Sequence, residues 1–302
     1  MMTIVIEQVC LLIAFAAVGF LLSKTKIANS SHSKLLSVIC FYIFLPSKVF
    51  TTFAEQFTPQ YLSEYWPLLL GATVIMAVLA LVAIPLSRLL TKHPYQRNVY
   101  HYSLTISNYG YIGYALAEGI FGKSVLMDVM MFAFPVCLYT YTIGYSMLTG
   151  GKFNWKKLFN PVTVSMVLGA AVGLSGLQLP ALAGQFLGKA SACMSPVSML
   201  LMGMVISQYA MKDMLSCWQN YVIIALRLLV LPCAVTAVLR LLGLEILVLP
   251  TLMVLAMPTG MNTIVFSELM GQDSKPGAAM ALVSSLLCCG TIPLCLWIFG
   301  LL

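Results

Sequence analysis

Charged side chains are scarce in this sequence of 302 residues, because Asp, Glu, Lys and Arg together make up only 8% of it. Soluble globular domains usually carry about 25% charged residues. The shortage excludes a water-soluble globule, and the 61% content of hydrophobic residues excludes a disordered chain. The net charge of +7 does not indicate a nucleic-acid binder, because the basic residues lie in small groups between long apolar runs.

Motifs for metal binding and catalysis are also lacking. The nine cysteines form no Cys-x-x-Cys pair, and none of the three histidines belongs to a His-Glu-x-x-His sequence. Almost all of the cysteines lie within apolar runs, where free cysteine usually packs as a small apolar side chain. We therefore expect no metal, no cofactor and no enzyme activity.

Long apolar runs are what the sequence does contain, and ten of them approach the roughly 20 residues that a helix needs to cross a bilayer. They lie near residues 3–22, 34–54, 65–90, 97–121, 125–148, 160–177, 182–208, 217–242, 247–270 and 275–301. The connections between them are short, so no domain fits outside the membrane. The sequence predicts an all-α, multi-pass protein whose function lies within the lipid bilayer.

Basic residues orient these ten predicted spans. The connections after odd-numbered spans hold eleven of them: Lys24, Lys26, Lys34, Arg88, Lys92, Arg97, Lys152, Lys156, Lys157, Lys212 and Lys275. The connections after even-numbered spans hold three: Lys123, Lys189 and Arg240. Because positively charged connections stay in the cytoplasm, we expect both termini outside a plasma (inner) membrane.

The two halves of the chain resemble each other at a spacing near 150 residues. The matching pairs are Pro46 with Pro196, Gly110 with Gly260, Glu118 with Glu268, and Gly122 with Gly271. We therefore predict two repeats, residues 1–150 and 151–302. Each repeat holds five spans, an odd number, so the second repeat inserts upside down relative to the first, as in many secondary transporters.

Two spans have polar, glycine-rich centres, at residues 107–113 (SNYGYIG) and 258–263 (PTGMNT). Proline and glycine weaken a helix, and unwound backbone at bilayer depth must be buried in protein or line a wet cavity. The N-terminal ends of half-helices favour anions. We predict a midplane site for a small organic anion, formed by Asn108, Tyr109, Gly110, Gly113, Pro258, Thr259, Gly260 and Asn262. Alternatively, the glycines only permit close helix packing and the asparagines satisfy freed backbone groups.

Several stretches of the chain resemble the auxin efflux carrier family, which is related to the bile-acid sodium symporter superfamily. They are SNYGYIGYALAEGIFG, FNPVTVSMVLGAAVGLSGLQLP, AMPTG and MGQDSKPGAAMALVSSLLCCGTIPL. The chain has no long cytoplasmic loop, and in this it resembles the compact prokaryotic branch of the family, the malate and malonate permeases. One departure is Ala115, where the family commonly has proline, so Gly110 and Gly113 are expected to break span four unaided.

This resemblance implies ten spans in two inverted halves, with spans four and nine crossing as broken helices. It implies a scaffold of about residues 1–58 and 155–211, and a moving transport unit of about residues 62–150 and 214–302. It also implies an organic-anion substrate such as a dicarboxylate or an auxin-like acid, and a homodimer.

Two basic residues lie inside predicted spans, where charge is costly and is a functional candidate by default. Lys48 is predicted to attract the anion; alternatively, it extends to the outer surface near Glu55. Arg227 is predicted either to face the cavity or to bind backbone carbonyls at the break before Pro232.

Glu118 and Glu268 follow the two predicted breaks by about two helical turns, roughly 12 Å by helix rise. They are candidates for carrying coupling protons; alternatively, they are carboxylates exposed at the membrane interface. The leading functional prediction is a secondary transporter that moves a small organic anion by alternating access. The alternatives are a sodium-coupled symporter of the bile-acid carrier type, a channel, and a membrane sensor without transport.

Overall fold

The computed structural model describes residues 2–150, 155–208, 217–264 and 275–301. Throughout these ranges the regular secondary structure is helical, and the one β-type pairing is an isolated antiparallel bridge between Ser107 and Thr259. The predicted all-α fold is therefore confirmed for the described chain.

Six helical segments are long and apolar enough to cross a membrane by length and composition. They are residues 31–56, 59–90, 109–149, 181–206, 218–241 and 276–298. Three shorter apolar helices cover residues 10–24, 161–175 and 245–255. The segment 109–149 contains one residue with a non-helical, left-handed backbone, Gly122 at φ 85°, where the sequence predicts the end of one span. The protein is thus an integral, multi-pass membrane protein.

The helices form two compact units. Unit 1 comprises residues 1–67, 110–131 and 159–208. It contains α1 (Met2–Lys24), α2 (Ser30–Ile39), η1 (Cys40–Phe44), α3 (Leu45–Gln56), α8 (Pro161–Ser175), α9 (Ala181–Ile206), most of η2 (Tyr109–Gly113), the first part of α6 (Tyr114–Tyr139) and the start of α4 (Pro59–Leu90).

Unit 2 comprises residues 68–109, 132–158 and 209–302. It contains the remainders of α4 and α6, together with α5 (Pro94–Thr105), η3 (Thr140–Gly144), α7 (Tyr145–Thr149), η4 (Trp155–Leu158), α11 (Trp218–Ala225), η5 (Leu226–Val230), α12 (Leu231–Leu241), α13 (Glu245–Leu255) and α15 (Lys275–Ile298).

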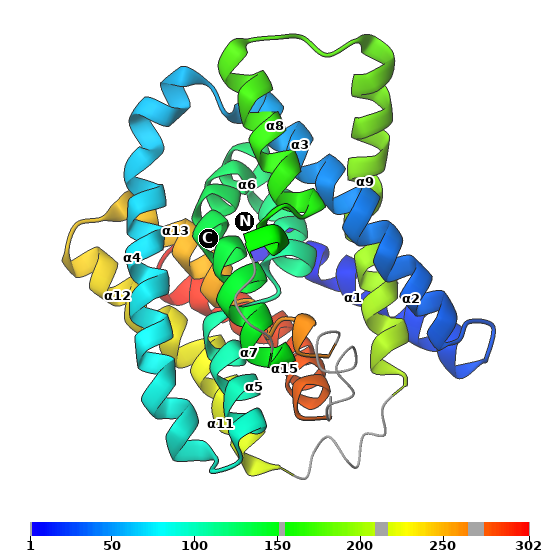
Figure 1. Ribbon diagram of the computed structural model, residues 1–302, viewed down its shortest axis with the longest axis vertical. Helices are drawn as coiled ribbons and strands as arrows, with labels where there is room; N and C mark the ends of the chain where they lie inside the picture. The colour runs from blue at the N-terminus through cyan, green and yellow to red at the C-terminus, as the bar shows by residue number, and fades with distance from the viewer. Residues whose placement is uncertain (1, 151–154, 209–216, 265–274, 302) are drawn as a thin grey trace. The chain divides into compact units, whose positions relative to one another are not determined.

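Glycines allow the helices of unit 1 to pack backbone against backbone. A Cβ atom on Gly203 of α9 would lie 1.8 Å from the carbonyl oxygen of Ala16 in α1. A Cβ atom on Gly169 or Gly173 of α8 would lie within 2.7 Å of carbonyl oxygens on the α3 side of the contact. The Gly-x-x-x-Gly sequence at residues 169–173 therefore serves a contact within one protomer, between α8 and α3 (Figure 1).

We expect Gly203→Ala to destabilise the protein by roughly 1–3 kcal/mol, because the added methyl group meets rigid backbone that cannot move aside cheaply. Gly188→Ala is the matched control, since it lies on the same helix with no atom within 4 Å of its added Cβ. There the change should be neutral or stabilising by about 0.5–1 kcal/mol, from helix propensity alone. Thermal unfolding in detergent compares the two, and equal melting temperatures would contradict the packing argument.

Two π-helical segments share a pattern, one in each unit. Both η1 and η5 are five residues long and are followed by Leu-Pro, at Pro46 and Pro232 respectively. Proline cannot donate a backbone hydrogen bond and its ring clashes with the carbonyl of the preceding turn, and a wider turn relieves that clash. In unit 2 this widened turn carries Arg227.

Candidate functional site

The first break in the helices of unit 2 follows α5, which ends at Thr105. Ile106 has an extended backbone (φ −114°, ψ 125°), and Ser107 forms the isolated bridge before the helix resumes at Tyr109. The hydroxyl of Thr105 donates back to the carbonyls of His101 and Tyr102, which caps the end of α5 locally. Consequently Ser107 and Asn108 lie in non-helical backbone, as the sequence predicts.

The second break follows α13, which ends at Leu255. Pro258 comes shortly after, and proline both lacks a backbone N–H and disfavours helical backbone at the residue before it. The chain returns to a helical turn only at residues 262–264. Thr259 and Gly260 are buried in this break, and Asn262 is half-buried at its end.

The two breaks contact each other within unit 2. Ser107 and Thr259 form the antiparallel bridge, and the backbone N–H of Asn108 donates to the carbonyl of Pro258 at 2.8 Å. An ideal Cβ on Gly260 would lie 3.5 Å from the carbonyl oxygen of Ser107, which is ordinary contact. These contacts pair freed backbone groups of one broken helix with those of the other, which lowers the cost of unwound backbone in an apolar interior.

Arg227 of η5 joins the ends of α5 and α13. It is fully buried, at 0% exposure, and its guanidinium donates to the carbonyls of Leu104 at 3.0 Å, Val254 at 3.2 Å and Met257 at 3.4 Å. Of the two sequence-based alternatives for this residue, binding of backbone carbonyls is confirmed. The carbonyls belong to the two interrupted helices, however, and not to the turn before Pro232.

Polar side chains at the breaks differ in how they are satisfied. The side-chain amide nitrogen of Asn108 and the hydroxyl of Ser107 are buried and have no hydrogen-bond partner among the described residues. The amide of Asn262, in contrast, donates to the hydroxyl of Tyr102 at 3.1 Å. Thr259 is held through its backbone N–H by the hydroxyl of Ser284 on α15 at 3.1 Å. Since buried polar groups nearly always find partners, the two orphaned groups mark a place where a ligand can supply an acceptor.

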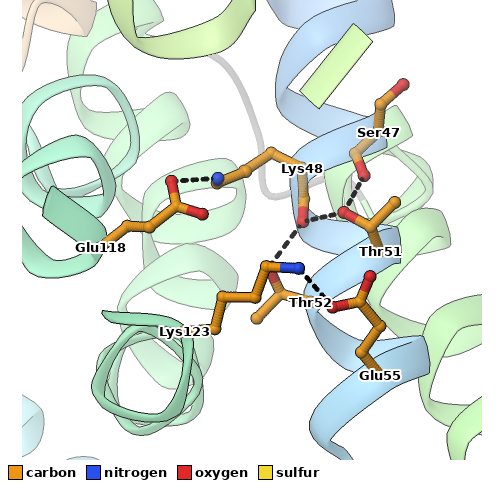
Figure 2. Close-up of polar contacts among 7 residues, drawn as sticks. All are labelled: Ser47, Lys48, Thr51, Thr52, Glu55, Glu118 and Lys123. Carbon is orange, nitrogen blue, oxygen red and sulfur yellow. Dashed lines mark hydrogen bonds and ion pairs between the residues drawn. The ribbon is translucent and has the colours of Figure 1, made fainter. Parts of the chain in front are cut away.

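A second polar cluster lies in unit 1, between α3 and α6 (Figure 2). Lys48 is buried, at 7% exposure, and forms an ion pair with Glu118. A neighbouring pair, Lys123 with Glu55 at 2.7 Å, is exposed. The sequence-based alternative in which Lys48 extends to the surface near Glu55 is therefore wrong, because Glu55 pairs with Lys123 and Lys48 points toward Glu118 (Figure 2).

The predicted site residues thus fall into two sets. Unit 2 contains Asn108, Tyr109, Pro258, Thr259, Gly260 and Asn262, and contacts join Asn108 to Pro258, and Thr259 and Gly260 to Ser107. Unit 1 contains Lys48, Gly110, Gly113 and Glu118, with Gly110 next to Leu45 one turn before Lys48. Glu268 lies outside the described residues.

Sequence reasoning missed three features of these clusters. The sequence does not single out Ser107, which is orphaned beside Asn108. It predicts neither the pairing of Lys48 with Glu118 nor which carbonyls Arg227 binds. A usable signal existed for the pair, since a lone Lys and a lone Glu in separate apolar spans are costly unless they meet. Among the residues that the structure describes, no group of three or more His, Cys, Asp or Glu side chains could hold a metal ion.

Known proteins that resemble this chain include the members of one family and an individual relative. A family model described as Membrane transport protein matches the chain twice, over residues 4–153 and over residues 147–298. An uncharacterized transporter of Methanocaldococcus jannaschii is 24% identical over 307 aligned residues, which cover 97% of this chain and 98% of that protein.

Proposed function

The chain belongs to the membrane transport protein family, whose model covers nearly all of it in two matches, and on that premise we propose that it is a secondary transporter for a small organic anion. Alternating access exposes one midplane site to each side of the membrane in turn. The site comprises Ser107, Asn108 and Tyr109 from the first break, and Pro258, Thr259, Gly260 and Asn262 from the second.

The observation that carries this proposal is the orphaned polar pair at the first break. The amide nitrogen of Asn108 and the hydroxyl of Ser107 can both donate a hydrogen bond, and neither has a partner in the described chain. A carboxylate accepts such bonds from neutral donors without requiring a buried ammonium or guanidinium opposite it. Arg227 is one cation of the described chain that lies at the ends of both interrupted helices, and a cation there disfavours a cationic guest.

The proposed architecture is ten spans in two inverted repeats of five, with the breaks of spans four and nine crossing at the site. The two matches to the family model meet at residues 147–153, which supports a boundary near residue 150. The backbone pairing of the two breaks, through Ser107 and Thr259, supports the crossing. The division into a scaffold and a transport unit, the homodimer, and a plasma-membrane location with both termini outside belong to the same proposal.

Lys48 and Glu118, which form the ion pair of unit 1, and Gly110 and Gly113 of η2 also belong to the proposed machinery. Glu118, and Glu268 in the second repeat, are proposed to carry coupling protons. The pairing of the half-buried Glu118 with the buried Lys48 supports a role in the cycle, because an ammonium is costly to bury in an apolar span and is a functional candidate there.

Uptake into proteoliposomes tests the function directly. Labelled mono- and dicarboxylates, each with its neutral amide analogue as control, are offered under imposed pH, sodium and voltage gradients. We expect saturable uptake of at least one carboxylate and none of its amide. Currents larger than the turnover rate of a carrier can produce would identify a channel instead. Tight binding of a carboxylate with uptake at background would identify a sensor. Either result overturns the proposal.

A further inference from the structure

Arg227 lies where the partial negative charges of two helix C-terminal ends come together. The last carbonyl groups of any α-helix lack intrahelical partners and carry partial negative charge. Leu104 is the penultimate residue of α5, and Val254 is the penultimate residue of α13, and the guanidinium donates to both carbonyls. A third donor reaches Met257 inside the second break. One side chain therefore neutralises the C-terminal ends of both interrupted helices.

In many secondary transporters, unwound carbonyls and half-helix C-terminal ends coordinate the coupling cation. Here three such oxygens are already bound by a guanidinium that cannot lose its proton in proteins and cannot leave the chain. In the part of the chain that the structure describes, the ion pairs are Lys48–Glu118 and Lys123–Glu55, so no described carboxylate neutralises Arg227. In the described chain its counter-charge is the partial negative charge of these carbonyl groups.

We propose that Arg227 is a protein-borne cation that takes the place of a soluble coupling cation at the paired breaks, so that anion transport needs no sodium. Arg227 acts as a positioning residue: it holds the ends of α5 and α13 together and fixes the backbone that carries Asn108 and Pro258. This inference rests on the proposed function where it is tested by uptake measurements. The melting measurements test it independently of that function.

Arginine suits this position better than lysine. The planar guanidinium presents five N–H donors in a fixed fork, and here its Nε, Nη1 and Nη2 atoms each reach a different carbonyl. A lysine ammonium has three donors on a compact head and cannot span the same three oxygens without moving the helix ends. Charge alone is therefore not enough to hold the arrangement.

The test compares Arg227→Ala and Arg227→Lys with Arg240→Ala, an exposed arginine on α12 that serves as the matched control. Each purified protein is melted in detergent in choline chloride, and then with added sodium chloride or low-millimolar guanidinium chloride. We expect the melting temperature of Arg227→Ala to fall by roughly 5–10 °C in choline and to recover partly with guanidinium or sodium, because the emptied carbonyl cluster regains a cation. Wild type and Arg240→Ala should not respond to either ion.

Flux in proteoliposomes gives the second readout. Wild-type uptake should be the same in sodium and in choline, whereas Arg227→Ala uptake should fall at least about tenfold in choline and recover with guanidinium or sodium. If Arg227→Ala does not fold, Arg227→Lys should show reduced flux that remains independent of sodium. Sodium-dependent wild-type uptake, or an Arg227→Ala protein indifferent to every cation, overturns the inference. Absence of any wild-type flux overturns the proposed function instead, and the melting experiment still decides the role of Arg227.

Discussion

Carboxylate uptake by the Asn108→Ala protein is expected to fall by roughly 100-fold, to near background, while the protein stays folded. A hydrogen bond to a charged group contributes about 1.5–3 kcal/mol, and loss of the donor disturbs both binding and the orientation of the ligand. Folding should change little, because the side-chain amide nitrogen of Asn108 has no hydrogen-bond partner to lose in the described part of the chain. Initial rates of labelled carboxylate uptake, together with the detergent melting temperature, separate the two effects.

Asn262→Ala is expected to lose flux to a similar degree but with a measurable cost in stability of about 1 kcal/mol, because Asn262 donates to Tyr102 at 3.1 Å. Asn29→Ala provides the matched control: Asn29 caps α2 from an exposed position, so its loss should lower stability by about 1 kcal/mol and leave uptake unchanged. Normal uptake by both site variants would refute the proposed site, whatever their melting temperatures.

The location of the two breaks could be predicted from the sequence because it follows from local chemistry. Pro258 has no backbone N–H to donate, and a Ser-Asn pair competes for backbone hydrogen bonds inside an apolar span. The sequence predicts that Gly110 and Gly113 break the helix of span four, and the structure differs. Both glycines lie in the π-helical segment η2, after the break, and the non-helical residues are Ile106, Ser107 and Asn108.

The physical reason for that difference is tertiary. Ser107 is held extended by its bridge to Thr259, and the backbone N–H of Asn108 is bound by the carbonyl of Pro258. These partners lie some 150 residues away along the chain, and local propensity says nothing of them. Arg227 is a similar case, since the sequence offers carbonyl binding as one alternative but cannot say which carbonyls, and the pairing of Lys48 with Glu118 joins residues 70 positions apart.

Reversing the buried charge of Lys48 is expected to have the second large effect. Lys48→Glu places two carboxylates together at a site where Lys48 is only 7% exposed, so we expect little folded protein. Glu118→Lys should fail in the same way, and the double swap Lys48→Glu with Glu118→Lys should recover most of the folded yield. The matched control is Lys123→Glu, which reverses the charge in the exposed neighbouring pair and should cost little stability.

Neutral variants then decide whether Lys48 also meets the anion. If the carboxylate of Glu118 competes with the substrate for Lys48, Glu118→Gln frees the ammonium and lowers KM, while Lys48→Gln raises it. If the pair only holds α6 against α3, both variants lower the free energy of unfolding by about 1–3 kcal/mol. Their melting temperatures then fall to a similar extent, and KM does not change. A change in KM therefore indicates a substrate contact, whereas a change in stability alone indicates a contact that only holds the two helices together. A KM that moves in the same direction in both variants would contradict competition, because removing the carboxylate and removing the ammonium act oppositely on an anion.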